Sequence, residues 1–503
     1  MRGGAAGHKG LRARRYDRRV PTPATMKLCS WPLPAELDVP GAVERLRRRG
    51  PVVALESALP SADRGGQSLV AGVPLATFTV ERGAVHVAAL RPGGEVFVGA
   101  AEQANGAKGA ATPFHALEKI VAAARFETGE TGASAPPLPA FGWFGYECAA
   151  PPELARLESF PDAWFLLTDT VVHWSAPGAA PRLWSADAAL GEELAAELAA
   201  AAGTREPEAS DDAHATRAAA SCAQDGDLSL SDYSAKFTAA RAALARGDSY
   251  QLCFTFPIER PFAGDPLALQ RMLRSANPAP FAAHVEAPFG AIVSSSPERF
   301  LAVDARGRVE ARPMKGTAAR PADRAARAQA ARELVASQKM LAENFMIADL
   351  LRNDLGRVCR IGSVRATKAA LLEETATLLQ LVSVIEGELA PGRTRADLLA
   401  SAFPPGSMTG APKTRSVELL RALEAGPRGP YAGALGYWSA DGRVDLSVVI
   451  RTLLLAHGTA RVQVGSGIVW DSEVEAEYAE CLAKAAAPLA ALAACAARRG
   501  GSA

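Results

Sequence analysis

Near its C-terminal end the chain carries apolar segments separated by short turn signals, and this pattern restricts the fold more than any other feature. Residues 434–438, 444–455 and 460–469 each resemble a β-strand. An Asp-Gly pair at 441–442 and a His-Gly pair at 457–458 separate them, and such pairs favour tight hairpin connections. We therefore predict a three-stranded antiparallel meander in this part of the chain.

The N-terminal half has a similar strand pattern. Residues 52–55, 75–80, 85–87 and 164–172 are rich in β-branched and aromatic residues, several of them in alternation with polar ones. After residue 230, apolar residues recur at helical spacing before the apolar run 252–256. Strands and helices are thus both predicted, and we expect an α/β (α+β) protein.

The composition changes between the two halves. Residues 204–212 are rich in charged and turn-forming residues, which is typical of a solvated linker. We therefore divide the chain into a basic tail (1–25), an N-terminal domain (26–200), a linker (201–230) and a C-terminal domain (231–495). The tail has seven Lys and Arg residues but no apolar segment of a secretory signal, so we expect it to be disordered.

Composition also restricts the partners. The 503 residues include 55 Lys+Arg and 54 Asp+Glu, a formal net charge of +1. With this balance no global field attracts the chain to nucleic acid or to an anionic membrane, so we expect neither partner. Charged residues interrupt the apolar runs before the roughly 20 residues that a spanning helix needs. Seven cysteines, an odd number without metal-type spacing, fit a reducing cytoplasm.

The last predicted helix carries a stripe of carboxylates. Glu473, Glu477 and Glu480 follow at spacings of four and three, and Lys484 follows four residues later, so all four share one face. Such a face is either solvated, with a Glu480–Lys484 pair, or a place to hold a divalent cation. Glu343 lies in a predicted helix too apolar for the surface, so its carboxylate needs a partner. A cation shared with the last helix would be such a partner.

Three further side chains could carry chemistry. Arg451 lies on the less apolar face of the predicted strand 444–455, where it could bind a carboxylate or simply face water. Lys315 precedes a glycine at a loop mouth; its amine is a nucleophile only if its pKa is lowered, and most such lysines are solvated. Glu298 could act as a general acid or form a surface ion pair with Arg299.

Two glycine-containing segments do not match nucleotide sites. Residues 406–413 lack both the spacing of a phosphate loop and the strand before it. Residues 465–467 lack the dinucleotide fingerprint, although their backbone amides could bind a small anion. We therefore predict neither a nucleotide triphosphatase nor a nicotinamide enzyme.

Eight segments, in a fixed order, carry a resemblance to a known family. They are Tyr250-Gln251, 295–300, 312–317, 342–358, 406–413, 450–452, 465–469 and 477–480. Together they closely resemble the component I family of chorismate-utilising enzymes, which includes anthranilate, aminodeoxychorismate, isochorismate and salicylate synthases. Residues 55–58 and 141–147 resemble the family's N-terminal elements. The resemblance implies an anthranilate synthase component I-like fold, with two interlocked domains and packed antiparallel sheets flanked by helices.

The resemblance also implies a substrate, chorismate, and a cofactor, Mg²⁺. Glu343 and Glu480 would hold the ion, with Glu477 in support, and the substrate's ring carboxylate would complete its shell. Lys315 would be the nucleophile and Glu298 the acid that protonates the leaving C4 hydroxyl. The substrate-binding residues that it implies are Thr317, Thr409, Tyr431, Arg451, Gly465 through its amide, and Lys484.

Positions 315 and 251 distinguish the branches of the family. Anthranilate and isochorismate synthases have Ala where this chain has Lys315, whereas aminodeoxychorismate synthases have Lys. Isochorismate and salicylate synthases have a water-activating Lys where this chain has Gln251. The pair therefore resembles the aminodeoxychorismate synthase branch, in which lysine adds at C2 and ammonia then enters at C4 of chorismate, a step towards 4-aminobenzoate and folate.

A partner follows from the same resemblance. The chain has no G-x-C-x-G elbow with a following His-x-Glu, so ammonia would come from a separate glutamine amidotransferase subunit. Anthranilate synthase component I is the nearest alternative. A catalytically silent regulatory subunit is another, because Leu55, Glu56 and Ser57 resemble the family's tryptophan site. Two departures are Gln380, where the family often has His, and Met340, where some members have an acidic residue.

Overall fold

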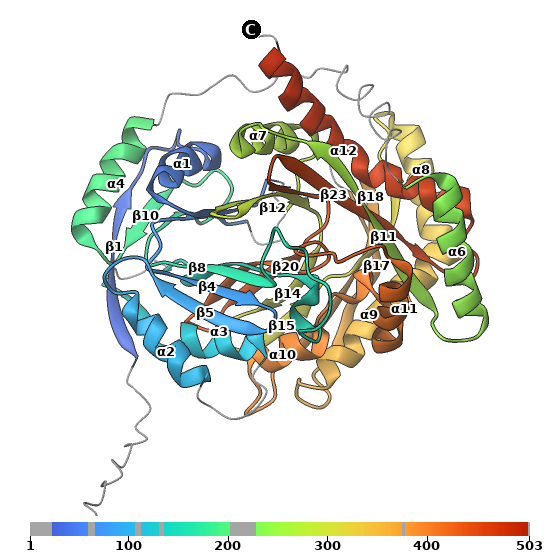
Figure 1. Cartoon of the computed structure of the whole chain (residues 1–503), viewed down its shortest axis with the longest axis horizontal. Coiled ribbons are helices and arrows are strands. Elements are labelled where there is room, and N and C mark those ends of the chain that lie inside the picture. The colour runs from blue at the N-terminus through green and yellow to red at the C-terminus, as the bar shows by residue number, and fades with distance from the viewer. Residues whose placement is uncertain are drawn as a thin grey trace, which may run out of the picture.

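The computed structural model describes residues 23–58, 66–105, 112–129, 135–201, 228–374 and 378–500, and the following account concerns these ranges. Two large sheets pack against each other, with helices around them (Figure 1). The predicted mixed class with packed, largely antiparallel sheets is confirmed. The predicted tail, apart from its last three residues, and most of the predicted linker lie outside the described residues.

The first sheet has twelve strands, and every pairing in it is antiparallel except that of β1 with β6. In spatial order its strands are β19 (Gly410–Ala411), β11 (Gln251–Pro261), β23 (Thr459–Ile468), β22 (Thr452–Ala456), β13 (Gly290–Ser296), β12 (Phe281–Ala287), β2 (Val52–Glu56), β3 (Ser68–Ala71), β9 (Val171–Trp174), β10 (Arg182–Ser185), β1 (Ala24–Pro32) and β6 (Ala124–Thr128).

The second sheet has eleven strands and is antiparallel throughout. In spatial order they are β16 (Met314–Ala319), β18 (Leu378–Glu388), β15 (Arg308–Ala311), β14 (Arg299–Val303), β21 (Val444–Val448), β20 (Ala434–Ser439), β7 (Pro139–Phe144), β8 (Ala163–Leu167), β4 (Ala76–Glu81) and β5 (Ala84–Ala89), with β17 (Arg365–Glu374) beside β18.

Helices cover the outer faces and edges of the sheets (Figure 1). They are α1 (Val39–Leu46), α2 (Glu95–Asn105), α3 (Pro113–Val121), α4 (Ala188–Ala201), α6 (Leu230–Ala245), α7 (Pro266–Ala276), α8 (Arg324–Ala336), α9 (Gln338–Gly356), α10 (Arg395–Ala402), α11 (Lys413–Leu423) and α12 (Val474–Gly500), with short 3₁₀ turns η1 (Arg47–Arg49), η2 (Tyr146–Ala149) and η3 (Gly406–Met408).

The two halves of the chain share both sheets. In the first sheet β2 of the N-terminal half pairs with β12 of the C-terminal half, and in the second β7 pairs with β20. Each sheet therefore runs across the proposed boundary at residues 201–230. The halves are interlocked, because neither half completes a sheet without strands from the other.

Aromatic side chains fill part of the space between the sheets. Trp143 of β7 and Trp164 of β8 are almost completely buried, with ring centroids 5.4 Å apart. Phe160 and Phe289 pack edge-on against the Trp143 ring. Burying one such side chain contributes about 1.5–3 kcal/mol, so this cluster holds the two sheets in a fixed relation.

The predicted three-stranded meander is wrong in one respect that matters for function. The apolar run 444–455 is not one strand: β21 ends at Val448 and β22 begins at Thr452. Arg451 between them has a positive φ of 53°, which breaks the extended backbone. The β20–β21 hairpin belongs to the second sheet and the β22–β23 hairpin to the first, so this short connection passes between the sheets.

Helix α12 is long and apolar enough to span a membrane, yet it packs as part of the protein core. Cys481, Ala485 and Leu489 on one side of it are buried in a cluster with residues of β11, β23 and α7.

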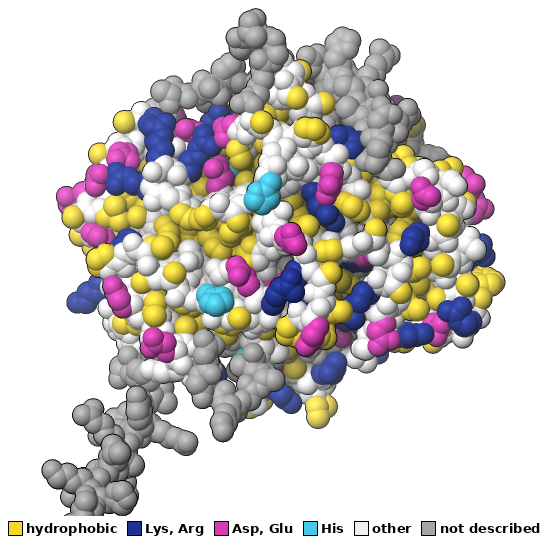
Figure 2. Space-filling model, viewed as in Figure 1, with side chains coloured by type: hydrophobic (Ala, Val, Ile, Leu, Met, Phe, Trp, Pro, Cys, Tyr) yellow, Lys and Arg dark blue, Asp and Glu magenta, His cyan; other side chains and the backbone are white. Residues whose placement is uncertain are grey.

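On the face seen in Figure 2, basic and acidic side chains are interspersed. This face therefore carries no broad patch of one sign of charge.

Candidate active site

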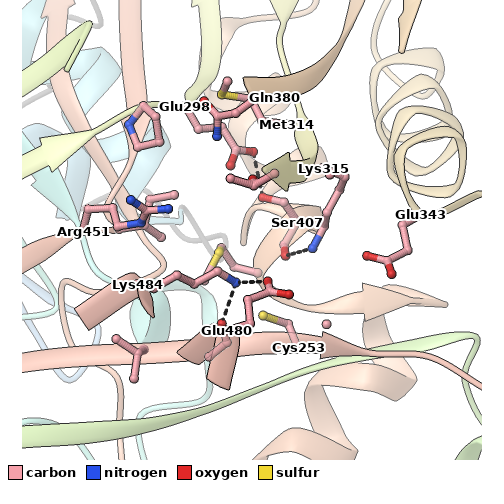
Figure 3. A pocket seen from close by; sticks show the side chains of 18 of the residues that line it. Cys253, Glu298, Met314, Lys315, Glu343, Gln380, Ser407, Arg451, Glu480 and Lys484 are labelled. Atoms are coloured by element: carbon pink, nitrogen blue, oxygen red, sulfur yellow. Dashed lines mark hydrogen bonds and ion pairs between the residues drawn. The ribbon is translucent and has the colours of Figure 1, made fainter. Parts of the chain in front are cut away.

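A cavity of about 360 Å³ lies where the edges of both sheets meet helices α9 and α12. Strands β16 and β18 form one wall, β11 and β23 another, and the turn η3 and the β21–β22 connection close it. Figure 3 shows how the side chains of Glu298, Lys315, Glu343, Arg451 and Glu480 are arranged around this space. Residues far apart in the sequence are thus brought to one place by the two shared sheets.

Glu298 lies between β13 and β14, with its carboxyl group buried. The Ser407 hydroxyl donates a hydrogen bond to Glu298 Oε1 over 2.8 Å, and the backbone N–H of Met314 also bonds the carboxylate. Burial raises the pKa of Glu298 to about 7, although Ser407 and the ammonium groups of Lys315 and Lys484 oppose the rise. Such a carboxyl can donate a proton near neutral pH.

The alternative surface pair between Glu298 and Arg299 is not formed. The Arg299 guanidinium donates instead to Glu310 over 2.7 Å and to Asp445 over 2.9 Å. This places Arg299 on the other face of β14 from the cavity, because successive strand residues point in opposite directions. Glu298 is left without an ion-pair partner within the described ranges.

Lys315 extends from β16 into the cavity, with its amine directed at Ser407 (Figure 3). A bulge at Gly316, with φ +81°, interrupts the pairing of β16 with β18. Lys315 Nζ donates a long hydrogen bond of 3.4 Å to the Ser407 carbonyl. Burial lowers the pKa of Lys315, but Cys253 and three nearby glutamates outweigh burial, so the pKa is raised. This differs from the lowered pKa that sequence reasoning required, because the surrounding glutamates hold the amine as an ammonium.

Arg451 presents its guanidinium to the cavity from the connection between the sheets. Within the described part of the chain no carboxylate pairs with it, and burial lowers its pKa against the opposing effects of Tyr431 and Glu480. A buried cation that lacks a partner is costly and is satisfied by a bound anion. Of the two alternatives for Arg451, the one in which it faces water from a strand is therefore wrong, since β21 ends before this residue and Arg451 lines the cavity.

Two other substrate-binding candidates line the same wall. Tyr431 is 4% exposed, and Gly465 of β23 also lines the cavity. A Cβ atom at Gly465 would be 2.4 Å from the carbonyl oxygen of Phe254, so only glycine fits. Lys484 Nζ donates to the Gly465 carbonyl over 2.9 Å and pairs with Glu480 over 2.6 Å.

The two threonines expected to bind substrate differ in whether they line the cavity. Thr317 of β16 lines the cavity. Thr409 does not: it is completely buried, and its hydroxyl donates to the carbonyl groups of Pro405 and Gly406. Thr409 therefore stabilises its own loop, because a 3₁₀ turn points its hydroxyl back along the chain.

Three glutamates face the cavity from two helices. Glu343 comes from the first half of α9, and Glu477 and Glu480 come from α12. The pKa of Glu343 is raised by burial and by the charges of Glu477 and Glu480, against Lys315 and Lys339. Glu473, the fourth glutamate of the predicted set, is exposed and lies outside the lining.

The donor set fits Mg²⁺, although the described residues contain no ready-made cage of three or more close acidic, His or Cys side chains. Glu477 is the most constrained of the three, because both Lys339 and Ser472 hold it, over 2.9 Å and 2.6 Å. Glu480 pairs with Lys484 alone, and Glu343 has no ion pair among the described residues, so these two are the better candidates for metal ligands. Mg²⁺ prefers carboxylate oxygens, keeps several waters and takes oxygen atoms from substrates, so two protein carboxylates suffice.

Several cavity residues were missed by sequence reasoning. Ser407 bonds both Glu298 and Lys315, yet its segment gives no sign of this apart from a position near a glycine. Lys339 lies four residues before Glu343, so helical spacing would have placed the two side chains on one face. Both departures from the family pattern, Met340 and Gln380, line the cavity.

Position 251 lies close to Lys315. A Cβ atom built on Gly467 would be 3.1 Å from Gln251 Nε2 and 3.3 Å from Lys315 Nζ. Gln251 is completely buried. The two positions that distinguish the branches of the resembled family thus flank the same glycine.

Leu55, Glu56 and Ser57 line a second, smaller cavity of about 50 Å³ between the sheets. Glu56 accepts a hydrogen bond from Arg274 over 2.8 Å through Oε1, whereas its Oε2 has no partner among the described residues. Burial raises the pKa of Glu56, with Arg274 opposing. A ligand much larger than a few waters would enter only if the lining side chains move.

The chain is similar in sequence and in fold to several known proteins. The model of a family described as chorismate binding enzyme matches residues 79–490. Aminodeoxychorismate synthase of Streptomyces griseus is 35% identical over 511 aligned positions, 96% of this chain and 67% of that protein. Aminodeoxychorismate synthase component 1 of Salmonella typhimurium is 40% identical over 258 positions, 51% of this chain and 57% of that protein.

Among solved structures, anthranilate synthase component I from Streptococcus pneumoniae superposes with a TM-score of 0.66 at 25% identity, covering 86% of this chain and 94% of that one. Several alignments with curated relatives span only part of those proteins, down to 27% of their length. The matches therefore identify the fold and the region that holds the cavity.

Proposed function

Because the chain belongs to the family of chorismate binding enzymes, we propose that it is the synthase component of an aminodeoxychorismate synthase. It would convert chorismate and ammonia to 4-amino-4-deoxychorismate, the precursor of 4-aminobenzoate and folate. The observation that carries this proposal is Lys315, whose Nζ lies in the same cavity as the carboxyl of Glu298 and shares Ser407 with it. An amine in this place provides a nucleophile that the anthranilate and isochorismate branches lack.

The proposed first step joins Lys315 to the substrate. The neutral amine attacks C2 of chorismate, the ring double bond shifts, and the C4–O bond breaks as Glu298 gives its proton to the leaving hydroxyl. Water, a glutamate carboxylate and a lysine-bound ring result. Lys315 must first lose its proton, since its pKa is raised in the site.

The second step exchanges lysine for ammonia. Ammonia attacks C4, the double bond shifts back, and the C2–N bond breaks, with its electron pair returning to the Lys315 nitrogen. The new C4 ammonium can give a proton to Glu298, which restores the acid. Gln251 beside Lys315 supplies no base to activate water, which favours the amine product over isochorismate.

Cationic and polar groups would hold the substrate's two carboxylates. We assign Arg451 to a bidentate interaction, because its guanidinium lies in the cavity without a carboxylate partner among the described residues. Tyr431, Lys484 and the Gly465 backbone would contact the rest of the substrate, with Thr317 at the edge. Thr409 has no part in this assignment.

Mg²⁺ would be held by Glu343 and Glu480, with Glu477 fixed nearby by Lys339. When bound, the ion would orient the ring carboxylate and offset negative charge in the site. Both glutamates raise the pKa of Lys315 in the metal-free protein. Neutralising them would therefore ease the deprotonation of Lys315 that the first step needs.

Ammonia would be supplied by a glutamine amidotransferase subunit, because this chain lacks that enzyme's nucleophile elbow. The relative from Salmonella typhimurium is itself named as a component 1. We also propose a cytoplasmic location, since the six described cysteines are all free thiols. A membrane or nucleic-acid partner is not part of this proposal.

The experiment is to incubate the chain with chorismate, Mg²⁺ and ammonium and to identify the product by mass and chromatography. Aminodeoxychorismate from the parent, greatly reduced in Lys315→Ala and unchanged in Lys27→Ala, supports the proposal; Lys27 is an exposed lysine on β1. Anthranilate as the product would instead favour the anthranilate synthase branch. No turnover with ammonium would favour the silent regulatory subunit.

We propose separately that tryptophan binds in the second cavity after the lining side chains move apart. The unpartnered Oε2 of Glu56 is a suitable acceptor for an α-amino group. Calorimetry with millimolar tryptophan tests this, with Glu56→Gln as the variant that should weaken binding. If no heat of binding is measured, the proposal that tryptophan binds is wrong, and the enzyme proposal is unaffected.

A further inference from the structure

Ser407 contacts both proposed reactive residues through two different atoms. Its hydroxyl donates to Glu298 Oε1 over 2.8 Å, and its backbone carbonyl accepts from Lys315 Nζ over 3.4 Å (Figure 3). Ser407 is 5% exposed, so water does not readily replace either contact. The acid and the amine thus depend on one residue for part of their orientation.

The segment that follows Ser407 is anchored at two points. The buried guanidinium of Arg428 donates to the Met408 carbonyl over 2.7 Å, next to Ser407. Lys413, at the end of the loop, pairs with Asp354 over 2.7 Å. Because these anchors hold the backbone, the position of the Ser407 carbonyl does not depend on its own side chain.

We propose that Ser407 is a positioning residue that orients the Glu298 carboxyl through its hydroxyl and the Lys315 amine through its carbonyl, so that acid and nucleophile meet the same substrate. The assignment of these roles rests on the proposed function. The two contacts are separable, since Ser407→Ala removes the hydroxyl and leaves the carbonyl in place.

The charged groups around Glu298 predict the sign of the effect. Lys315 on β16 and Lys484 on α12 favour its carboxylate form, and Arg451 faces the same cavity. The Ser407 hydroxyl adds a neutral donor that also favours the carboxylate. Loss of this donor, with the cations unchanged, makes deprotonation of Glu298 harder.

The test is an infrared titration of the protonated carboxyl band of the full chain, without substrate, with the band assigned by its loss in Glu298→Gln. In Ser407→Ala we expect the band to persist to a pH about one unit higher than in the parent. Ser407→Thr, which keeps the hydroxyl, should restore the parent titration. Ser416→Ala is the matched control, because it removes another buried hydroxyl of the same region, one that bonds Ser249 and the Pro412 carbonyl.

The outcomes decide between positioning and a general structural role. An unchanged titration in Ser407→Ala, or an equal shift in Ser416→Ala, would overturn the proposal. If Ser407→Ala does not fold, Ser407→Cys carries the test, since its weaker thiol donor must shift the titration in the same direction by less. The alkaline limb of the pH profile for turnover should move with the infrared titration. If the parent makes no aminodeoxychorismate, the substrate-free titration still decides the role of Ser407.

Discussion

The buried carboxyl of Glu298 should destabilise the folded protein above neutral pH, where it becomes charged. The variant Glu298→Gln, which cannot become charged, should therefore be more stable than the parent at high pH. Folding raises the pKa of Glu298 from 4.5 to about 7, mainly through burial. A group with a raised pKa stabilises the folded state below its unfolded pKa and loses that contribution as pH rises through the folded value. The loss between pH 4.5 and 7 corresponds to about 3 kcal/mol. Glutamine keeps the size and an acceptor for Ser407 but never carries the charge.

The assay is urea unfolding of parent and Glu298→Gln at pH 5 and pH 8, followed by tryptophan fluorescence. We expect the variant to gain about 2.5 kcal/mol in unfolding free energy relative to the parent on going from pH 5 to pH 8, because part of the loss in the parent already occurs below pH 5. Its chorismate turnover should be lost. Glu473→Gln, which changes an exposed glutamate just before α12, is the control and should show no such difference from the parent. An equal difference between parent and Glu298→Gln at both pH values would refute the reasoning from burial.

Three further predictions concern the metal, the substrate and the nucleophile. Glu343→Gln should raise the Mg²⁺ concentration for half-maximal activity about tenfold or more, whereas Asp349→Asn on the exposed face of α9 should not; equal requirements would contradict the metal assignment. Arg451→Lys should raise the KM for chorismate about tenfold or more, because an ammonium cannot replace a bidentate guanidinium, and an unchanged KM would remove Arg451 from the site. Acetylation of Lys315, followed by peptide mass spectrometry, should occur at lower pH when Mg²⁺ is present, because the ion offsets the charges of Glu343 and Glu480. An unchanged pH dependence would show that Mg²⁺ does not affect the protonation of Lys315.

The sequence predicted the layers of the fold better than the connections between them. Alternating apolar residues and turn pairs identified strands in both halves, since these are local properties. The uninterrupted apolar run 444–455 concealed the break at Arg451, because a change of sheet depends on tertiary packing and not on local propensity. Yet this break is what brings Arg451 to the cavity.

For the site, the resemblance identified the residues, and the structure shows how their side chains are arranged around one cavity. Lys315 and Glu298 could each be a solvated side chain by their local sequence, and only the resemblance to a family gave them roles. Glu343 was already unusual as a carboxylate in an apolar helix. The raised pKa of Lys315 depends on charges from three other elements and from the β13–β14 connection, which no local pattern reveals. The same is true of Ser407, whose two contacts join residues about 100 positions apart.

The central claim, that Lys315 forms a bond to the substrate, is tested most directly by mass spectrometry. The chain is incubated with chorismate and Mg²⁺ without ammonia, quenched in acid and digested. The account predicts that the peptide containing Lys315 gains the mass of chorismate less one water, and that added ammonium removes this adduct as aminodeoxychorismate is released. Formation of aminodeoxychorismate with no adduct at any time, or at an undiminished rate in Lys315→Ala, would contradict covalent catalysis by this lysine.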